Sequence, residues 1–282
     1  MTMTPMLLYQ DVCRKCSKLV TLNYSTSFSL GIRAFQPRFR MPVYAIYGFV
    51  RFADEIVDSF HGHNKAVLLK RFREDTDLAI EEGISLNPVL MSFQEVVREY
   101  RVDRASIDAF LDSMEMDLSQ SSHDNRSYDT YIYGSAEVVG LMCLRVFCEG
   151  DEEMYHRLKD GAKSLGAAFQ KVNFLRDMQS DFDDRGRIYF PGVDFEVFRN
   201  EDKRAIEQDI EQDFDRALAA IRQLPKGARL GVHLAYVYYW NLFKKIKRAD
   251  AAAVKRKRFR VNDGRKILLL LTTTLRHRLN MM

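Results

Sequence analysis

Apolar residues recur through most of this chain at the spacing of helices. In residues 6–24, for example, Leu8, Val12 and Leu19 fall near a single face, because positions three, four or seven apart share one side of a helix. The same period predicts a series of helices, of which the second begins with Pro42 in its first turn. The predicted helices are residues 6–24, 42–58, 65–82, 87–100, 104–119, 128–148, 152–179, 201–223, 230–248 and 265–280.

Residues that break helices or favour strands are scarce. The 282 residues include only 14 Gly and 6 Pro, and one short segment, residues 187–190, has the character of a strand. No Gly- or Ser-rich linker divides the chain, and a hydrophobic content of 46% is enough for a sizeable core. We therefore predict one all-α domain over residues 1–282, with eight to eleven helices around a central cavity.

Acidic residues at helical spacing are the main chemical signal. Asp54 and Asp58 are four apart in one predicted helix, and Asn173, Asp177 and Asp181 repeat that spacing in another, so each set forms a stripe of oxygen atoms. Taken alone, either stripe fits a solvated helix face. Both lie in or after largely apolar segments, however, where carboxylates are costly unless they are paired or bind a metal. Two such stripes across a cavity predict Mg²⁺ ions that hold a diphosphate, with Mn²⁺ as the alternative ion.

The remaining candidate sites carry less weight. Cys13 and Cys16 have the CxxC spacing of a zinc or redox site, but no second pair follows, so we expect buried thiols and no disulfide framework. The six histidines are scattered along the chain and offer no site.

Residues 1–5 lack the basic region of a signal peptide, and no apolar run is long enough to span a bilayer. A cytoplasmic protein is therefore expected.

Positive charge is concentrated near the C-terminus. Residues 244–278 hold 13 Lys or Arg against two Asp, a net charge of +11, in a chain whose whole net charge is +4. Four roles are open: binding nucleic-acid phosphates, docking on anionic lipid at the inner membrane face, contact with a substrate diphosphate, and a solvated cluster without a ligand. Because no nucleic-acid module accompanies these residues, we expect no nucleic-acid partner.

Five ordered segments resemble motifs of the squalene/phytoene synthase family, and together they cover nearly the whole chain. They are Tyr-Ser-Thr-Ser-Phe at residues 24–28, an aspartate-rich run at 44–58, a tyrosine-rich helix at 131–140, a second aspartate-rich run at 170–181, and Gly-Arg-Ile-Tyr-Phe-Pro at 186–191. One departure concerns the tyrosine-rich helix, where Glu137 and Val138 replace the usual Gly-Thr. A Glu there must find a proton, a basic partner or water.

The resemblance implies an isoprenoid-synthase helical bundle that joins two prenyl diphosphates head to head, through a 1–1′ bond. It implies that the catalytic residues are the four stripe aspartates and Tyr131, which the family places near the carbocation. The implied metal ligands are Asp54, Asp58, Asn173, Asp177 and Asp181. The implied diphosphate contacts are Ser25, Ser27, Tyr47, Arg51, Gln170, Arg176, Tyr239 and Arg258. The expected tunnel walls include Phe28, Ile32, Phe49, Ala136, Leu141, Ala167 and Phe169.

The segment at residues 187–191, Arg-Ile-Tyr-Phe-Pro, bears on the product. It is nearer the Arg-Ile-Tyr-Leu-Pro form of phytoene synthases than the Arg-Glu-Phe-Trp-Pro form of squalene synthases. This favours 15-cis-phytoene from two geranylgeranyl diphosphates, in carotenoid biosynthesis and without NADPH. The alternative is a farnesyl diphosphate-using enzyme that makes dehydrosqualene, or squalene with NADPH. A relative that kept the fold and lost catalysis is disfavoured because both acidic stripes are present, and the oligomeric state stays open.

Overall fold

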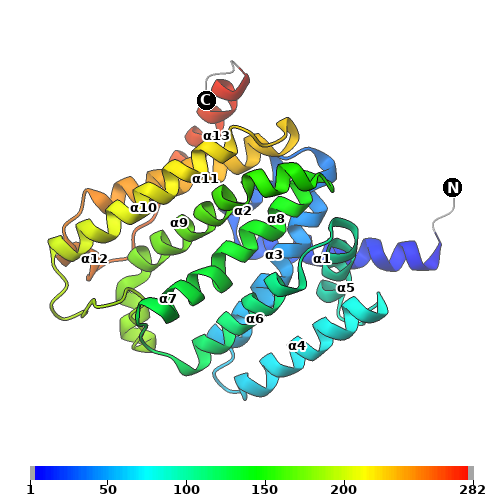
Figure 1. Cartoon of the computed structure of the whole chain (residues 1–282), viewed down its shortest axis with the longest axis horizontal. Coiled ribbons are helices and arrows are strands. Elements are labelled where there is room, and N and C mark those ends of the chain that lie inside the picture. The colour runs from blue at the N-terminus through cyan, green and yellow to red at the C-terminus, as the bar shows by residue number, and fades with distance from the viewer. Residues whose placement is uncertain (1–3, 279–282) are drawn as a thin grey trace.

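The computed structural model of this chain describes residues 4–278 and is built from helices (Figure 1). The predicted all-α class is confirmed. The elements are α1 (Pro5–Tyr24), α2 (Thr26–Arg33), α3 (Pro37–Asp58), α4 (Lys65–Glu82), α5 (Pro88–Tyr100), α6 (Arg104–Ser119), α7 (Asn125–Ile132), the π-helical turn η1 (Tyr133–Glu137), α8 (Val138–Cys148), α9 (Glu152–Arg185), α10 (Asn200–Ile221), α11 (Lys226–Lys247), α12 (Ala251–Val254) and α13 (Asp263–Arg278).

The helices pack in an ordered series across the molecule. In Figure 1, α10, α9, the α7–η1–α8 helix, α6 and α4 follow one another, and each packs against the next. The helices α1, α3 and α5 form a second packed group, joined to the first through contacts of α3 with α8 and α6. Where α3, α5 and α6 meet, the fully buried rings of Phe49 and Phe93 stack at 3.9 Å and Phe110 packs against Phe49. These contacts make one continuous apolar core.

Helix starts follow local capping chemistry. The side chains of Asn64, Asn87 and Asp151 each accept a hydrogen bond from a backbone N–H in the first turn of α4, α5 and α9. Such caps satisfy donors that have no partner within the helix. The prediction that Pro42 starts a helix was wrong: α3 begins at Pro37, and Pro42 lies inside it. Pro37 occupies the first helical position, where the missing N–H costs nothing.

Several further differences separate the observed elements from the predicted ones. The short helices α2 and α12 were not predicted, and α9 runs six residues beyond the predicted end at residue 179. Residues 128–148 are helical as predicted, but the turn at η1 is a π-helix. Within residues 4–278, the expected strand at 187–190 is reduced to one isolated bridge between Ser122 and Ile188. The helix predicted to end at residue 280 is described as far as residue 278, and residues 279–280 lie outside the described part.

The continuous helix at residues 125–148 is long and apolar enough to cross a membrane by length and composition. In the 18-residue window of that helix that meets this test, 56% is buried inside the bundle. The buried core helix of a bundle also meets these criteria of length and composition, and burial of this extent is typical of such a helix. The four cysteines are free thiols; Cys13 and Cys148 are buried, whereas Cys143 and Cys16, which was expected to be buried, are half-buried.

Candidate active site

An apolar tunnel of about 240 Å³ runs between the helices of the bundle. Its walls come from α2, α3, η1, α8, α9, α10 and α11, and its polar residues include Gln170, Asn173 and Tyr239. Four of the predicted wall residues line it: Phe28, Ile32, Ala136 and Phe169. The other three, Phe49, Leu141 and Ala167, are buried in the packed core and are absent from the lining.

Glycines set the spacing of the tunnel walls. A Cβ atom on Gly166 of α9 would lie 2.4 Å from the carbonyl oxygen of Ala136 in η1, and one on Gly140 of α8 would lie 2.5 Å from the carbonyl oxygen of Ala162 in α9. Real Cβ contacts are essentially never that short. The close approach of α9 to the α7–η1–α8 helix therefore requires glycine at both positions.

The first predicted stripe lies on α3. Tyr47 is half-buried, hydrogen-bonds Ser25 and lies near the charges of Arg51 and Asp54; burial is the main cause that raises its pKa to about 12. Ser25 also caps α2, because its hydroxyl accepts a hydrogen bond from the N–H of Phe28 at 3.2 Å. Arg51 lies 4.4 Å above the ring of Tyr24 and forms an ion pair with Glu55. The side chains of Asp54 and Asp58 are half-buried.

The second predicted stripe lies on α9, and its Asp177 is held by two arginines. The Nε atoms of Arg258 and Arg176 lie 2.7 Å and 3.0 Å from Oδ1 of Asp177. Arg258 reaches this position because Phe259 and Val261 beside it are buried and fix the segment that follows α12. The structure therefore brings Arg176, Arg258 and Asp177 together, as the prediction of a diphosphate-binding end requires.

Asn173 and Tyr239 meet at the polar part of the tunnel. Asn173 hydrogen-bonds the Tyr239 hydroxyl, and the Tyr239 ring stacks on Phe169 at 3.9 Å. Burial is the main cause that raises the pKa of Tyr239. The Oδ1 atom of Asn173 is buried and accepts no hydrogen bond from any residue in the described part of the chain. A buried acceptor facing a cavity without a partner fits a ligand atom or ion that supplies one.

The oxygen-rich residues of both stripes fit Mg²⁺ by their chemistry, since it prefers carboxylate and amide oxygens. Among residues 4–278, no three Asp, Glu, His or Cys side chains lie close enough together to hold one ion. Arginines stand beside the carboxylates instead: Arg176 and Arg258 pair with Asp177, and Arg187 lies 3.8 Å from Oδ1 of Asp58. The metal-ligand assignments of the five stripe residues therefore stay predictions.

Among the predicted site residues, Gln170, Asn173 and Tyr239 line the tunnel, and the others, which include Ser27 and Tyr131, do not. Ser27 lines a separate small cavity of about 30 Å³ between α2, α11 and α13. Tyr131 is buried under Tyr189, and its hydroxyl donates to the carboxylate of Asp117 at 2.9 Å. Glu137, which departs from the family motif, has found a basic partner as expected: Lys163 lies 3.3 Å from its carboxylate.

The sequence interpretation missed Asp117 altogether and gave Arg187 no role. Asp117 pairs with Arg187 at 3.0 Å and with Tyr131, although these partners are 70 and 14 residues away. One signal was present in the sequence: Asp117 follows Phe110 by seven residues and Met114 by three, so it falls on the apolar face of α6. A carboxylate on such a face requires a partner.

Comparisons with known proteins were consistent with these features. The model of the squalene/phytoene synthase family matches residues 21–265. The chain is 31% identical over 173 residues to presqualene diphosphate synthase of Rhodopseudomonas palustris, covering 59% of this chain and 58% of that protein. It is 30% identical over 278 residues to phytoene synthase of Pseudescherichia vulneris, covering 88% and 87%. Against phytoene synthase 3 of Zea mays the chain spans 52% of the relative's length.

Solved structures share the fold. A dehydrosqualene synthase in complex with ligand superposes with a TM-score of 0.81 and 22% identity, covering 98% of this chain and 99% of that one. Squalene synthase HpnC from Alicyclobacillus acidocaldarius gives a TM-score of 0.75 at 18% identity, covering 86% and 95%. With a family model matched over most of its length, on a bundle with an apolar tunnel and arginine-paired carboxylates, this chain belongs to the squalene/phytoene synthase family.

Proposed function

We propose that this protein is a prenyltransferase that joins two prenyl diphosphates head to head. The observation that carries the proposal is the tunnel, which is apolar along its length and polar where α9 presents Gln170 and Asn173. Apolar walls suit isoprenoid chains and exclude the water that would quench a carbocation. Arg176 and Arg258 suit the diphosphate, because a planar guanidinium grips phosphate oxygens in two places.

In this proposal one substrate ionises to an allylic cation and diphosphate. The double bond of the other attacks that cation, and loss of a proton closes the ring of a cyclopropylcarbinyl diphosphate. Departure of the second diphosphate gives a cation that rearranges, and loss of a further proton gives the neutral 1–1′ linked hydrocarbon; squalene would instead need a hydride from NADPH. Asp54, Asp58, Asn173, Asp177 and Asp181 would hold Mg²⁺, which when bound neutralises charge on the departing diphosphate. Tyr47, Arg51 and Tyr239 would orient the diphosphate groups. The remaining wall residues would keep the chains folded against each other.

For the product we propose 15-cis-phytoene from two geranylgeranyl diphosphates, as part of carotenoid biosynthesis. The Arg-Ile-Tyr-Phe-Pro segment and the phytoene synthase of Pseudescherichia vulneris among the relatives support it. A second candidate is a C15-using enzyme that forms presqualene diphosphate, dehydrosqualene or squalene. The presqualene diphosphate synthase of Rhodopseudomonas palustris, at 31% identity, favours that candidate.

Product extraction distinguishes these candidates. The protein would be incubated with C15 or C20 diphosphate and Mg²⁺, with and without NADPH, and the apolar extract analysed by mass. We expect a C40 hydrocarbon from the C20 substrate without NADPH, and none after chelation of the metal; Mn²⁺ is expected to restore turnover. A C30 product alone would establish the second candidate.

Two substitutions test the site. Asp54→Ala and Asp177→Ala are each expected to abolish turnover while the helical circular dichroism signal is kept, because each removes a charge from one stripe. The outer helix face offers a control in Asp75→Ala, an exposed carboxylate on α4. Full activity in either stripe variant would refute the site assignment.

We also propose that the protein works in the cytoplasm, with peripheral contact to the inner membrane face through residues 244–278. The net charge of +11 and the exposed side chains of Leu268 and Leu271 on α13 support this. Co-sedimentation with vesicles that contain anionic lipid should fall as salt is raised, and binding to neutral vesicles should be weak. Equal binding to both would contradict it.

A further inference from the structure

Asp117, near the end of α6, is the centre of a buried polar cluster. Only 7% of its side chain is exposed, and Tyr131 donates its hydroxyl hydrogen to the carboxylate, with oxygen distances of 2.9 and 3.1 Å. The Nη1 atom of Arg187 lies 3.0 Å from the same carboxylate, and its Nη2 donates to the backbone carbonyl of Asp117. Asp117 therefore fixes both a buried tyrosine and an arginine from a distant segment.

The arginine belongs to the segment at residues 186–190, which follows α9 and is attached on two sides. The N–H of Ile188 donates to the carbonyl of Ser121 at 2.9 Å, just beyond α6. The ring of Tyr189 stacks on Phe174 of α9 at 3.9 Å with an interplanar angle of 3°. The segment thus joins the end of α6 to the face of α9 one turn before Asp177.

The same arginine lies beside both predicted metal stripes. Its Nη1 is 3.8 Å from Oδ1 of Asp58, and it lines a small cavity together with Asp181. Only 11% of the Arg187 side chain is exposed, so its charge is poorly screened and depends on these carboxylates. Loss of the Asp117 carboxylate would remove the nearest carboxylate partner of Arg187, which would keep the backbone carbonyl of Asp117 and the Tyr189 hydroxyl and would be held less firmly beside Asp58.

We propose that Asp117 and Arg187 are positioning residues for prenyl transfer: their ion pair holds residues 186–190 against α6 and fixes Tyr131 and Asp58 relative to each other. Asp117 and Arg187 contact Tyr131, each other and Asp58, so we assign them an indirect role that acts through these partners. The kinetic consequence rests on the proposed function, whereas the attachment of the segment does not. Partners that orient ligand groups in this way typically change activity by about 10- to 100-fold when removed.

The test uses the full chain and the variants Asp117→Asn, Arg187→Gln and Arg187→Lys. Hydrogen exchange at the Ile188 amide reports directly on the attachment, and kcat, KM and the Mg²⁺ concentration for half-maximal rate report on the site. We expect Asp117→Asn and Arg187→Gln to speed exchange at Ile188 and to lower kcat by about 10- to 100-fold, with a smaller change in KM. Arg187→Lys should recover part of both, because it keeps the charge without the planar fork.

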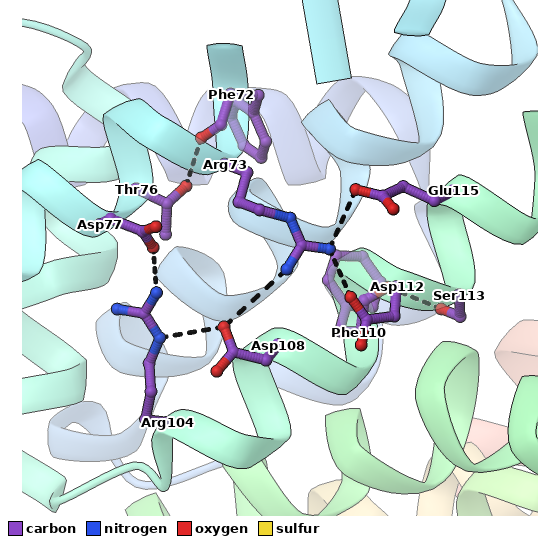
Figure 2. Close-up of polar contacts among 10 residues, drawn as sticks. All are labelled: Phe72, Arg73, Thr76, Asp77, Arg104, Asp108, Phe110, Asp112, Ser113 and Glu115. Carbon is purple, nitrogen blue, oxygen red and sulfur yellow. Dashed lines mark hydrogen bonds and ion pairs between the residues drawn. The ribbon is translucent and has the colours of Figure 1, made fainter. Parts of the chain in front are cut away.

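A matched control lies on the other side of α6. Arg73 of α4 pairs with Asp108, Asp112 and Glu115 of α6 (Figure 2), so Arg73→Gln removes an ion pair from the same helix without touching the segment. It is expected to lower the melting temperature while leaving kcat and Ile188 exchange unchanged.

Four results bear on the outcome. Unchanged Ile188 exchange in Asp117→Asn and Arg187→Gln would overturn the proposal, as would an equal loss of kcat in Arg73→Gln. If Asp117→Asn does not fold, Arg187→Gln alone decides whether the ion pair holds the segment, because Arg187 lies outside the helices and its substitution changes no helical residue. If the unaltered chain turns over no prenyl diphosphate, the proposed function fails, and Ile188 exchange still decides whether the pair holds the segment.

Discussion

The approach of α9 to η1 yields a prediction whose size follows from one contact. In Gly166→Ala the new Cβ would lie 2.4 Å from the Ala136 carbonyl oxygen, whereas ordinary contact begins at 3.4 Å. The helices must therefore separate by about 1 Å, or the backbone must distort. Forcing an extra methyl into a packed interior typically costs about 1–3 kcal/mol. The loss is opposed by the gain in helix propensity of Ala over Gly, about 1 kcal/mol.

A second glycine separates the cost of the clash from the gain in helix propensity. Gly31 also lines the tunnel, but a Cβ there would meet only the Gly231 carbonyl oxygen, at an ordinary 3.5 Å. Because both substitutions occur in helices, the difference between Gly31→Ala and Gly166→Ala isolates the clash. At about 2–4 °C per kcal/mol for a chain of this size, we expect the melting temperature of Gly166→Ala to lie about 2–12 °C below that of Gly31→Ala. Calorimetry would measure it, and equal melting temperatures would refute the reasoning.

Two further predictions concern buried charge. Lys171 of α9 ion-pairs with Asp213 and Asp209 of α10, and only 10% of its side chain is exposed. Lys171→Met should therefore lower the free energy of unfolding, measured by urea titration, by about 3–5 kcal/mol. The double variant Lys171→Met, Asp213→Asn should lose less of this free energy, because it removes the carboxylate charge as well. His123 has its pKa lowered, first by burial and then by the charge of Arg187, so the folded state favours the neutral ring. Stability should therefore fall as the pH drops below 6.5, the ordinary pKa of histidine. In His123→Gln the melting temperature should fall less between pH 7.5 and 5.5 than in the unaltered protein. The same pH dependence of melting temperature in the variant and the unaltered protein would contradict the assignment.

Helical periodicity predicted the fold class and most of the helices because it depends on local spacing alone. It failed where tertiary contacts decide the outcome. The helix α2 has only eight residues, too few for the period to be read, and its start depends on the Ser25 hydroxyl. The end of α9 was placed too early because the polar residues after Gln179 give no apolar stripe. The π-helical turn at η1 accompanies the contact of Gly134 with the carbonyl of Ala109, which no local pattern records.

In the candidate site, too, local spacing predicted some features and tertiary contacts decided the others. Gln170 and Asn173, three residues apart on α9, line the tunnel together, as helical spacing predicts. Which partner each charge would find was not predictable, because Arg258 reaches Asp177 across 81 residues of chain. The position of Phe49 was also unpredictable: an apolar residue on a core helix packs equally well against a tunnel or against Phe93.

Asp117 shows what a sequence can and cannot say about such a site. Its place on the apolar face of α6 requires that something neutralise or solvate the carboxylate, and this follows from one helix alone. The choice of Tyr131 and Arg187 follows only when α6, α7 and the segment after α9 are packed together. The cost of burying a charge is therefore visible locally, while its compensation is a property of the fold. In a helical sequence, a carboxylate on an apolar helix face therefore predicts a tertiary contact, although the sequence does not say with which residue.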